Sequence, residues 1–379
     1  MLLGLDAIPL TEPRAGVGQY TYELARALAH AAPGEEFELV SPSSYPPVNL
    51  EEREPLPSNL KEARVRVGAL GRRWWSAGLP AYAARRGLRL FHGTNYEVPL
   101  WGGATRVLTV HDLSLLSHPE THERRRVWRA RRRLPLMALA ADAVVTPTEA
   151  VRREVCARLR VSASKVFAVH EAARDCFKPM DRREAEDALR GLGIDGKFLL
   201  AVGTIEPRKN LAALVRAFEE VLRERPESAL RLVVAGGRGW LSGPLFELIE
   251  KSPARNRVVL AGYVSDEQLR ALYSSCTAFV YPSLYEGFGL PPLEAMSCGA
   301  PVVAGDTPAV AEVSGGAARL FDPRDATQLA RAILELLDDD AARRALSEAG
   351  LRRAAQFSWH RTARATLDVY AEALKRRRQ

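Results

Sequence analysis

The stretch AFVYPSLYEGFGLPPLEAM at residues 278–296 predicts a strand, a glycine-rich turn and a short helix, in that order. The apolar run at 278–281 is typical of a buried strand. Pro291 and Pro292 suit the first turn of a helix, where a missing N–H costs no hydrogen bond, and Gly299 is placed to end that helix. Because such a helix points free N–H groups and the positive end of its dipole at the turn, the turn favours a phosphate.

The turn and the helix each carry one carboxylate, Glu286 and Glu294. With the glycines and prolines around them, these acids closely resemble the Glu-x7-Glu signature of retaining nucleotide-sugar glycosyltransferases, in particular glycosyltransferase family 4. The resemblance implies that Glu286 accepts hydrogen bonds from the donor sugar and that Glu294 holds the ribose hydroxyls. It also implies that sugar and phosphate oxygens face the backbone N–H groups of Gly287, Phe288, Gly289 and Leu290. A turn acid and a solvated helix acid are the alternative.

Predicted strands alternate with predicted helices along most of the chain, which indicates parallel sheets covered by helices on both faces. In the first half the predicted strands lie at 2–7, 37–40, 65–67, 90–91, 107–110 and 143–146. The alternation breaks at about 171–196 and then restarts, so we expect two domains.

The predicted organisation is an acceptor-binding domain at 1–172, a donor-binding domain at 173–357 and a helix at 358–379 that packs on the first domain. The fold class is α/β. The family resemblance implies the GT-B fold, in which two Rossmann-like, doubly wound domains face a cleft and the last helix crosses back to the N-terminal domain.

The segment GTIEPRKN at 203–210 resembles the turn with which the family binds the donor diphosphate. Gly203 opens this turn, and Thr204 stands where many relatives have an arginine. Lys209 matches the family's lysine, and we expect Arg208 to help supply the missing cation. Two solvated residues are the alternative, but cations at the start of a helix oppose its dipole, so a bound anion explains them better.

Two further segments resemble parts of the family's donor site. Tyr263 and Val264 lie where relatives hold the base, and a core position for Tyr263 is the alternative. Gly16 and Gly18 resemble the glycine loop that brings the main chain near the diphosphate, and a tight turn between strand and helix is the alternative.

The pair His111-Asp112 follows a predicted strand and resembles the family's His-Asp pair, whose histidine contacts the donor sugar. A residue at the carboxyl end of a parallel strand faces the ligand crevice, whereas a lone histidine is more often structural. Asp112 is placed to orient the ring or to cap the next helix. The predicted catalytic residues are therefore His111, Asp112, Arg208, Lys209 and Glu286.

The resemblance implies transfer with retention of configuration and without a metal ion or other cofactor, because cationic side chains clamp the leaving diphosphate. No carboxylate is an evident nucleophile, which favours a front-face substitution. The forms GTIEPRKN and EGFGLP are similar to mannosyltransferases of surface polysaccharide synthesis. We therefore expect transfer of mannose from GDP-mannose, a nucleotide-sugar donor, to a glycan or lipid-linked acceptor, with UDP-hexose donors as the alternative.

The chain of 379 residues carries a formal net charge of +8, which favours anionic partners. Arginine clusters at 124–126 and 131–133 flank Trp128, and another at 72–73 precedes Trp75. They favour contact with an anionic membrane, and a solvated basic face with both tryptophans buried is the alternative. A nucleic-acid-binding protein and an inactive nucleotide-sugar-binding scaffold are rivals from other classes, although no recognised nucleic-acid motif accompanies the clusters.

The N-terminus lacks the basic and apolar regions of a signal peptide, and the four cysteines show no metal-type spacing. We therefore expect reduced cysteines and a cytoplasmic protein, with the inner face of the membrane as the surface that its basic clusters would touch.

Overall fold

The computed structural model describes residues 1–11, 16–49, 55–68 and 73–377. The chain packs as two compact units, each built around its own sheet. The first unit comprises Met1–Leu113, Trp128–Glu171 and Ser358–Gln379, and the second comprises Ser114–Val127 and Ala172–Phe357. Arg72, in one of the arginine clusters, lies outside the described residues.

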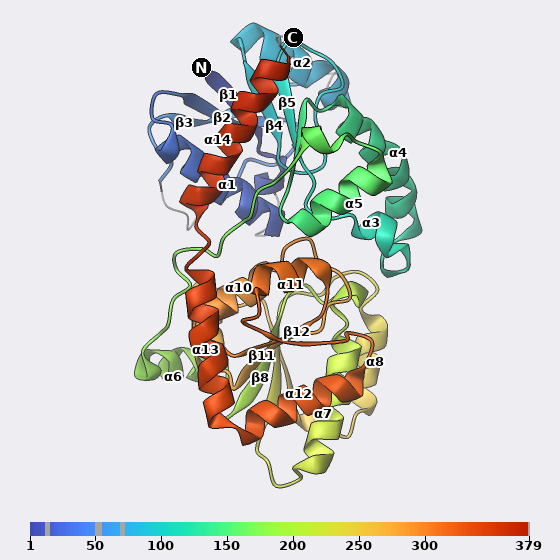
Figure 1. Ribbon diagram of the computed structural model, residues 1–379, viewed down its shortest axis with the longest axis vertical. Coiled ribbons are helices and arrows are strands. Elements are labelled where there is room, and N and C mark those ends of the chain that lie inside the picture. Colours follow the sequence, from blue (N-terminus) through green and yellow to red (C-terminus); the bar gives the residue numbers. More distant parts are fainter. Residues whose placement is uncertain (12–15, 50–54, 69–72, 378–379) are drawn as a thin grey trace. The chain divides into compact units, whose positions relative to one another are not determined.

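The first unit is built on a sheet of seven strands in the order β3-β2-β1-β4-β5-β6-β7, and every strand pair is parallel (Figure 1). The strands are β1 (Leu2–Asp6), β2 (Glu36–Pro42), β3 (Leu60–Val65), β4 (Leu90–Gly93), β5 (Thr105–Thr109), β6 (Ala143–Thr146) and β7 (Val166–Ala168). Its helices include α1 (Gly16–Ala31), α2 (Leu79–Arg86), most of α4 (Arg124–Ala140), α5 (Glu149–Leu159) and α14 (Trp359–Arg376).

The second unit has a sheet of six parallel strands in the order β10-β9-β8-β11-β12-β13. The strands are β8 (Phe198–Val202), β9 (Arg231–Ala235), β10 (Val258–Gly262), β11 (Ala278–Tyr281), β12 (Val302–Gly305) and β13 (Arg319–Phe321). Its helices are α3 (Ser114–Ser117), α6 (Arg182–Arg190), α7 (Leu211–Glu224), α8 (Gly243–Lys251), α9 (Asp266–Ser275), α10 (Leu290–Ser297), α11 (Pro308–Ser314), α12 (Ala326–Asp338) and α13 (Asp340–Ala354).

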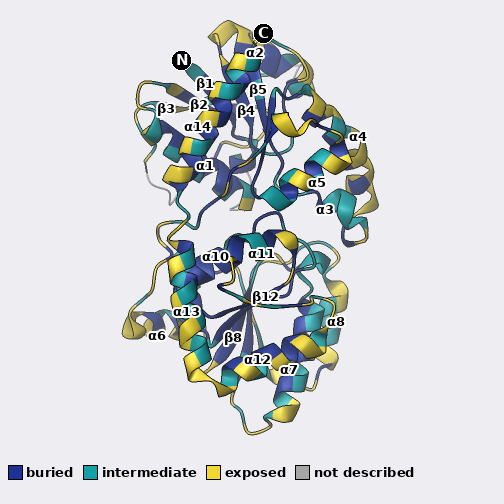
Figure 2. Cartoon of the chain, viewed as in Figure 1, coloured by how far each residue is buried: buried dark blue, intermediate teal, exposed yellow. Residues whose placement is uncertain are grey.

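Burial explains which strands the sequence revealed. The central strands β8, β11 and β12 are almost entirely buried (Figure 2), so they appear in the sequence as apolar runs. The strand predicted at 65–67 was wrong, because the third strand runs from Leu60 to Val65 and pairs with β2 along that whole length. β3 is an edge strand whose middle residues are mostly exposed and charged, so its sequence LKEARV contains no apolar run.

The last helix, α14, packs against α1 of the first unit, as Figure 1 shows. The Thr362 hydroxyl donates to the carbonyl of His170 at 2.8 Å. Further along the helix, the Tyr370 hydroxyl lies 2.7 Å from Nδ1 of His92, whose Nε2 lies 2.7 Å from the Thr109 hydroxyl. Burial lowers the pKa of His92 to about 3, so its ring is neutral. With no exposed surface and both nitrogens occupied, His92 is part of the core that holds α14.

We expect Tyr370→Phe to lower the free energy of unfolding by about 1–3 kcal/mol, because it leaves a buried nitrogen of His92 without a partner. Urea denaturation measures the loss. Tyr263→Phe is the matched control, because the Tyr263 ring is 67% exposed. Equal stability of the two variants would contradict a role for this hydrogen bond in holding α14.

Candidate active site

The second sheet reverses its strand order between β8 and β11, two neighbouring parallel strands. The chain leaves β8 toward β9 and leaves β11 toward β12, so the segments that follow these two strands diverge. This reversal opens a crevice at the carboxyl ends of the strands, which is where ligands bind in doubly wound sheets. The segment 203–210 follows β8 and the segment 282–289 follows β11. Topology therefore brings the two predicted donor-binding segments to the same place.

A cluster of two cations and two carboxylates joins these segments. Glu286 forms an ion pair of 2.9 Å with Nη1 of Arg208 and another of 2.8 Å with Nζ of Lys209. Arg208 also pairs with Glu206 at 2.6 Å, and Lys209 donates a hydrogen bond of 2.7 Å to the Tyr281 hydroxyl. The side chains of Arg208, Lys209 and Glu286 are only 9–12% exposed. The two charges of each sign are therefore held together in a largely dry environment.

Backbone geometry fixes the turn that carries these cations. Asn210 adopts a left-handed conformation with φ of 53°, which asparagine tolerates better than most residues. Its side-chain amide donates to the carbonyls of Pro282 and Pro323, at 3.2 and 2.7 Å. A Cβ on Gly236 would lie 2.0 Å from the carbonyl oxygen of Gly203. Only glycine therefore allows the chain at the end of β9 to come this close to the turn. The turn is therefore braced by β9 and by the segment after β11.

The cluster sets the charge of its own members. Burial alone would raise the pKa of Glu286, but Arg208 and Lys209 outweigh this effect and lower it to about 2, so Glu286 is ionised. Burial lowers the pKa of Lys209 despite the neighbouring Glu286, and burial raises the pKa of Glu206 despite Arg208. An anion that enters the crevice would therefore find two preassembled cations whose present partners are carboxylates.

Glu294 occupies a separate environment on α10. This helix begins after Gly289, whose φ of 102° requires a glycine, and has prolines in its first turn as predicted. Glu294 accepts a hydrogen bond of 3.2 Å from the Tyr273 hydroxyl and lies 4.0 Å from Nε of Arg174. Arg174 is itself paired with Asp266 at 2.6 Å. Burial raises the pKa of Glu294 to about 7, although Arg174 lowers it. The two acids of the signature thus differ in charge at neutral pH.

The other predicted donor-site residues lie at the carboxyl edge of the second sheet, on the segments that follow its strands. Thr204 is exposed, whereas Phe288 is buried and packs edge-on against Phe357 at 5.9 Å. Tyr263 is 67% exposed, so the interpretation of this ring as core is wrong. Val264, its neighbour, is buried in the core of the unit.

In the first unit, His111 follows β5 and lies at the carboxyl end of the sheet. Its Nε2 donates to the carbonyl of Thr94 at 2.8 Å, and its Nδ1 lies 3.3 Å from Glu171. Tyr20 packs edge-on against the ring, with the centroids 4.7 Å apart. Glu171, not Asp112, therefore orients the ring. A direct hydrogen bond from His111 to a sugar requires one of its two nitrogens to exchange its partner.

The two glycines at the start of α1 differ. A Cβ on Gly18 would lie 2.7 Å from the carbonyl oxygen of Pro9, so packing requires glycine there. A Cβ on Gly16 would meet no atom within 4 Å, and Gly16 is exposed. The tight-turn interpretation thus accounts for Gly18, and only Gly16 has open space in front of its Cα.

Comparisons with known proteins connect both units to one family. Residues 14–172 match the family described as "Glycosyltransferase Family 4", and residues 183–353 match "Glycosyl transferases group 1". The O-antigen chain mannosyltransferase B of Escherichia coli is 31% identical over 382 residues, which cover 96% of this chain and 97% of that protein. The chain belongs to glycosyltransferase family 4.

Solved structures agree with the fold of this glycosyltransferase. Sucrose-phosphate synthase from Thermosynechococcus elongatus matches with a TM-score of 0.75 at 22% identity, over 98% of each chain. The HepE protein of Anabaena, in complex with UDP and glucose, matches with a TM-score of 0.74 at 19% identity, over 98% of this chain and 99% of that one. At these identities the likeness shows the fold alone, and it confirms the predicted GT-B architecture.

Around the predicted site residues of each unit, the structure places further residues that the sequence did not reveal. These are Glu206 and Tyr281 around the cations, Arg174, Asp266 and Tyr273 around Glu294, and Glu171 beside His111. Asp266 lies in the first turn of α9, where an acid is expected for the helix dipole, so its sequence context hides its second role. Glu206 lies in the predicted turn and could have been found there.

We expect the affinity of the enzyme for a nucleoside diphosphate to fall as the pH falls below about 7. In the role predicted for Glu294, the ribose hydroxyls donate to its carboxylate, and its raised pKa means that a proton must leave before they bind. Calorimetric titration between about pH 6 and pH 8 measures the slope, at most about tenfold per pH unit. Glu294→Gln should remove the pH dependence of affinity that comes from this residue. Only the dependence that comes from titration of the phosphate itself should remain. An identical slope in both proteins would contradict the ribose role of Glu294.

Proposed function

We propose that this enzyme is a retaining mannosyltransferase that uses GDP-mannose and a glycan or lipid-linked acceptor in surface polysaccharide synthesis. The observation that carries the proposal is the buried cluster of Arg208, Lys209 and Glu286 at the strand-order reversal of the second sheet. The choice of mannose follows the E. coli relative, whose name is O-antigen chain mannosyltransferase B and which matches over nearly its whole length.

In the proposed reaction the donor diphosphate takes the place of Glu286 as a partner of Arg208 and Lys209. These cations offset the charge that develops on the leaving phosphate, which is the role a metal ion has in other transferases. Glu286, freed from one or both cations, accepts hydrogen bonds from the sugar hydroxyls. Before the donor binds, these two cations hold the pKa of Glu286 at about 2, so its carboxylate is already ionised when the sugar arrives.

The transfer itself is proposed to be a front-face substitution. The bond from the anomeric carbon to the diphosphate oxygen breaks, and the acceptor oxygen forms its bond to the same face of that carbon. The proton of the acceptor hydroxyl moves to the leaving phosphate oxygen. His111 is proposed to contact the transferred sugar, and the Glu171 carboxylate positions its ring.

UDP-hexose donors are the second candidate, and the observation in their favour is the HepE structure, which contains UDP and glucose. The pattern of cations and carboxylates fits either nucleotide, because it addresses the diphosphate and the sugar and not the base. An inactive scaffold is less consistent with the cluster, since the complete set of charges is present and mutually paired.

Donor identity is tested with a panel of nucleotide sugars, by melting shift and by release of the nucleoside diphosphate. We expect GDP-mannose to give the largest shift and turnover that a chelator does not reduce. Arg208→Ala and Lys209→Ala should each lower kcat by about 10²–10³-fold, the range for loss of one charge-stabilising donor.

Glu286→Ala should lose the preference among donor sugars while keeping affinity for GDP, and Glu227→Ala, an exposed acid elsewhere, should change neither. A larger melting shift with a UDP-sugar than with GDP-mannose would show that the donor is a UDP-sugar. Loss of turnover on chelation, with recovery on addition of magnesium, would overturn the metal-free mechanism.

We further propose that α4 of the first unit brings the enzyme to an anionic membrane surface. Trp128 is 60% exposed, so the interpretation that buries this ring is wrong, and Arg132 stacks on it at 4.3 Å. Leu136 and Leu139 are also exposed, and positions 128, 136 and 139 share one face of a helix. An apolar strip bordered by arginines fits the boundary between headgroups and acyl chains. None of the described helices has the length and apolar character needed to span a membrane.

Sedimentation with vesicles tests this surface. Vesicles that contain phosphatidylglycerol should retain the protein at low salt and release it at high salt, because the attraction is partly electrostatic. Trp128→Ala should weaken binding by about tenfold, the value of one buried apolar side chain. Trp101→Ala is the matched control, because Trp101 is equally exposed, at 59%, and lies outside α4. Equal losses in both variants, or no binding at all, would remove the proposal.

A further inference from the structure

The first unit contains a pocket of about 390 Å³ at the amino-terminal edge of its sheet. Arg89 directly precedes β4, and Thr105 is the first residue of β5. His111 follows the opposite end of β5, and a five-residue strand is roughly 17 Å long. The pocket therefore does not belong to the site around His111. Its volume lies in the range of small-molecule sites.

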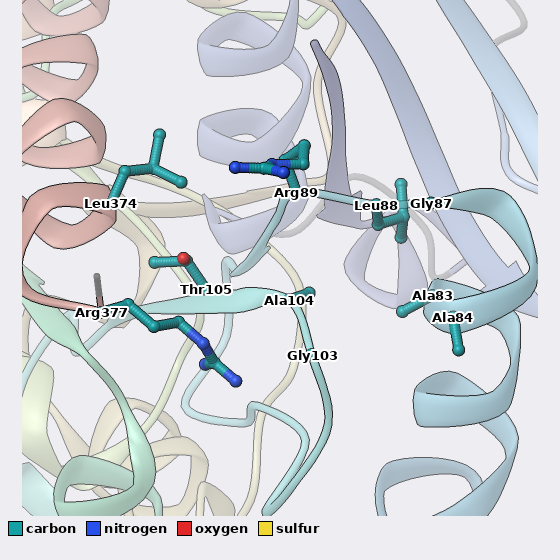
Figure 3. Close-up of a pocket in the computed structure, with 10 residues that line it drawn as sticks. All are labelled: Ala83, Ala84, Gly87, Leu88, Arg89, Gly103, Ala104, Thr105, Leu374 and Arg377. Atoms are coloured by element: carbon teal, nitrogen blue, oxygen red, sulfur yellow. The ribbon is translucent and has the colours of Figure 1, made fainter. Parts of the chain in front are cut away.

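The residues that line this pocket come from α14 and β5 on one side and from α2 on the other (Figure 3). The figure shows Leu374, Thr105 and Arg377 on the side next to α14, and Ala83, Ala84 and Leu88 on the side of α2. Arg89 extends between the two sides. The residues on the α2 side are small or apolar, so they leave room for a short organic group without competing for its polar atoms.

Two arginines face the pocket with different constraints. The guanidinium of Arg89 forms no hydrogen bond or ion pair with any residue that the structure describes, and Arg89 is exposed. Arg377 is held in place by Asp142 at 2.9 Å, and Asp142 also accepts from Arg106 at 3.3 Å. Arg377 is thus oriented by its partner, while Arg89 has its full donor capacity available. A pair of guanidinium groups is the usual means of gripping a phosphate.

Thr105 adds a hydrogen-bonding group to the pocket. The residue is 2% exposed and lines the pocket, and its hydroxyl forms no hydrogen bond with any residue that the structure describes. This hydroxyl is not among the described polar atoms that are fully enclosed and lack a partner, so it is open to the pocket. A ligand oxygen in the pocket would accept from this hydroxyl in place of solvent.

We propose that this pocket is a second anion site, which binds a phosphate monoester through Arg89, Arg377 and the Thr105 hydroxyl. The site lies away from the transfer chemistry, so its occupant is not the sugar donor. Its ligand is either a soluble ester with a short organic group or the phosphate of a lipid headgroup, and both present the same chemistry to the arginines. A bound phosphate would also tie α14 to the start of β4, because Arg377 follows α14 and Arg89 precedes β4.

Hydrogen exchange of the full chain tests the site by location and does not depend on turnover. Glycerol 3-phosphate and, separately, vesicles containing phosphatidic acid are the probes. We expect slower exchange in the segments 83–90 and 103–109 with at least one probe. Protection by the soluble ester alone identifies a soluble ligand, and protection by the vesicles alone identifies a headgroup. No protection in these segments with either probe would overturn the proposal.

Matched variants make the test specific. Arg89→Ala should raise the apparent Kd at least about tenfold, the value of one charge-assisted hydrogen bond. Arg85→Ala, near the end of α2 but outside the pocket, should leave the Kd unchanged. Thr105→Val should weaken binding while leaving the melting temperature equal or higher, because the hydroxyl has no partner to lose. Binding unchanged in Arg89→Ala, or a lower melting temperature with unchanged binding in Thr105→Val, would show that these residues have structural roles only.

Discussion

The ion pairs of Glu286 with Arg208 and Lys209 are the interaction on which the donor half of this enzyme depends. They join the segments after β8 and β11, two strands that are neighbours in space but 75 or more residues apart in sequence. Because the strand order reverses between them, no helix or loop crosses directly from one to the other. These side-chain charges connect the two segments together with hydrogen bonds from the Asn210 amide to the Pro282 carbonyl and from the Leu284 N–H to the Arg208 carbonyl. The same charges are those that a diphosphate and a sugar would engage.

The two acids of the signature illustrate how environment divides similar residues into different roles. Glu286 has two cations as direct partners, which outweigh the effect of burial on its pKa. Glu294 has one arginine at 4.0 Å, already shared with Asp266, and burial prevails. The first acid is therefore ionised while the two cations are its partners, whereas the second is poised near neutral pH, where its charge responds to what binds next to it. A sequence motif that treats the acids as a pair does not show this difference.

The first unit holds oriented polar side chains at both edges of one sheet. His111 is held at the carboxyl edge by Glu171 and Thr94, while Arg377 is held at the amino edge by Asp142. Between these edges, α14 is joined to the interior of the unit by the hydrogen bond between Tyr370 on α14 and His92 on β4. Any ligand that stabilises the docking of α14 would therefore act on the same body that carries His111, through packed core and not through direct contact.

The sequence by itself indicated two α/β domains, because buried parallel strands and glycine turns leave patterns that are local in the chain. Its resemblance to glycosyltransferase family 4 implied the GT-B fold and pointed to the segments that carry Arg208, Lys209 and Glu286. The sequence did not reveal β3, whose charged residues face solvent at a sheet edge. Nor did it reveal Arg174, Glu171 or the pocket at Arg89, because each owes its importance to residues far away in the chain. Only the tertiary structure decides such pairings, since burial and charge partners are properties of neighbours in space.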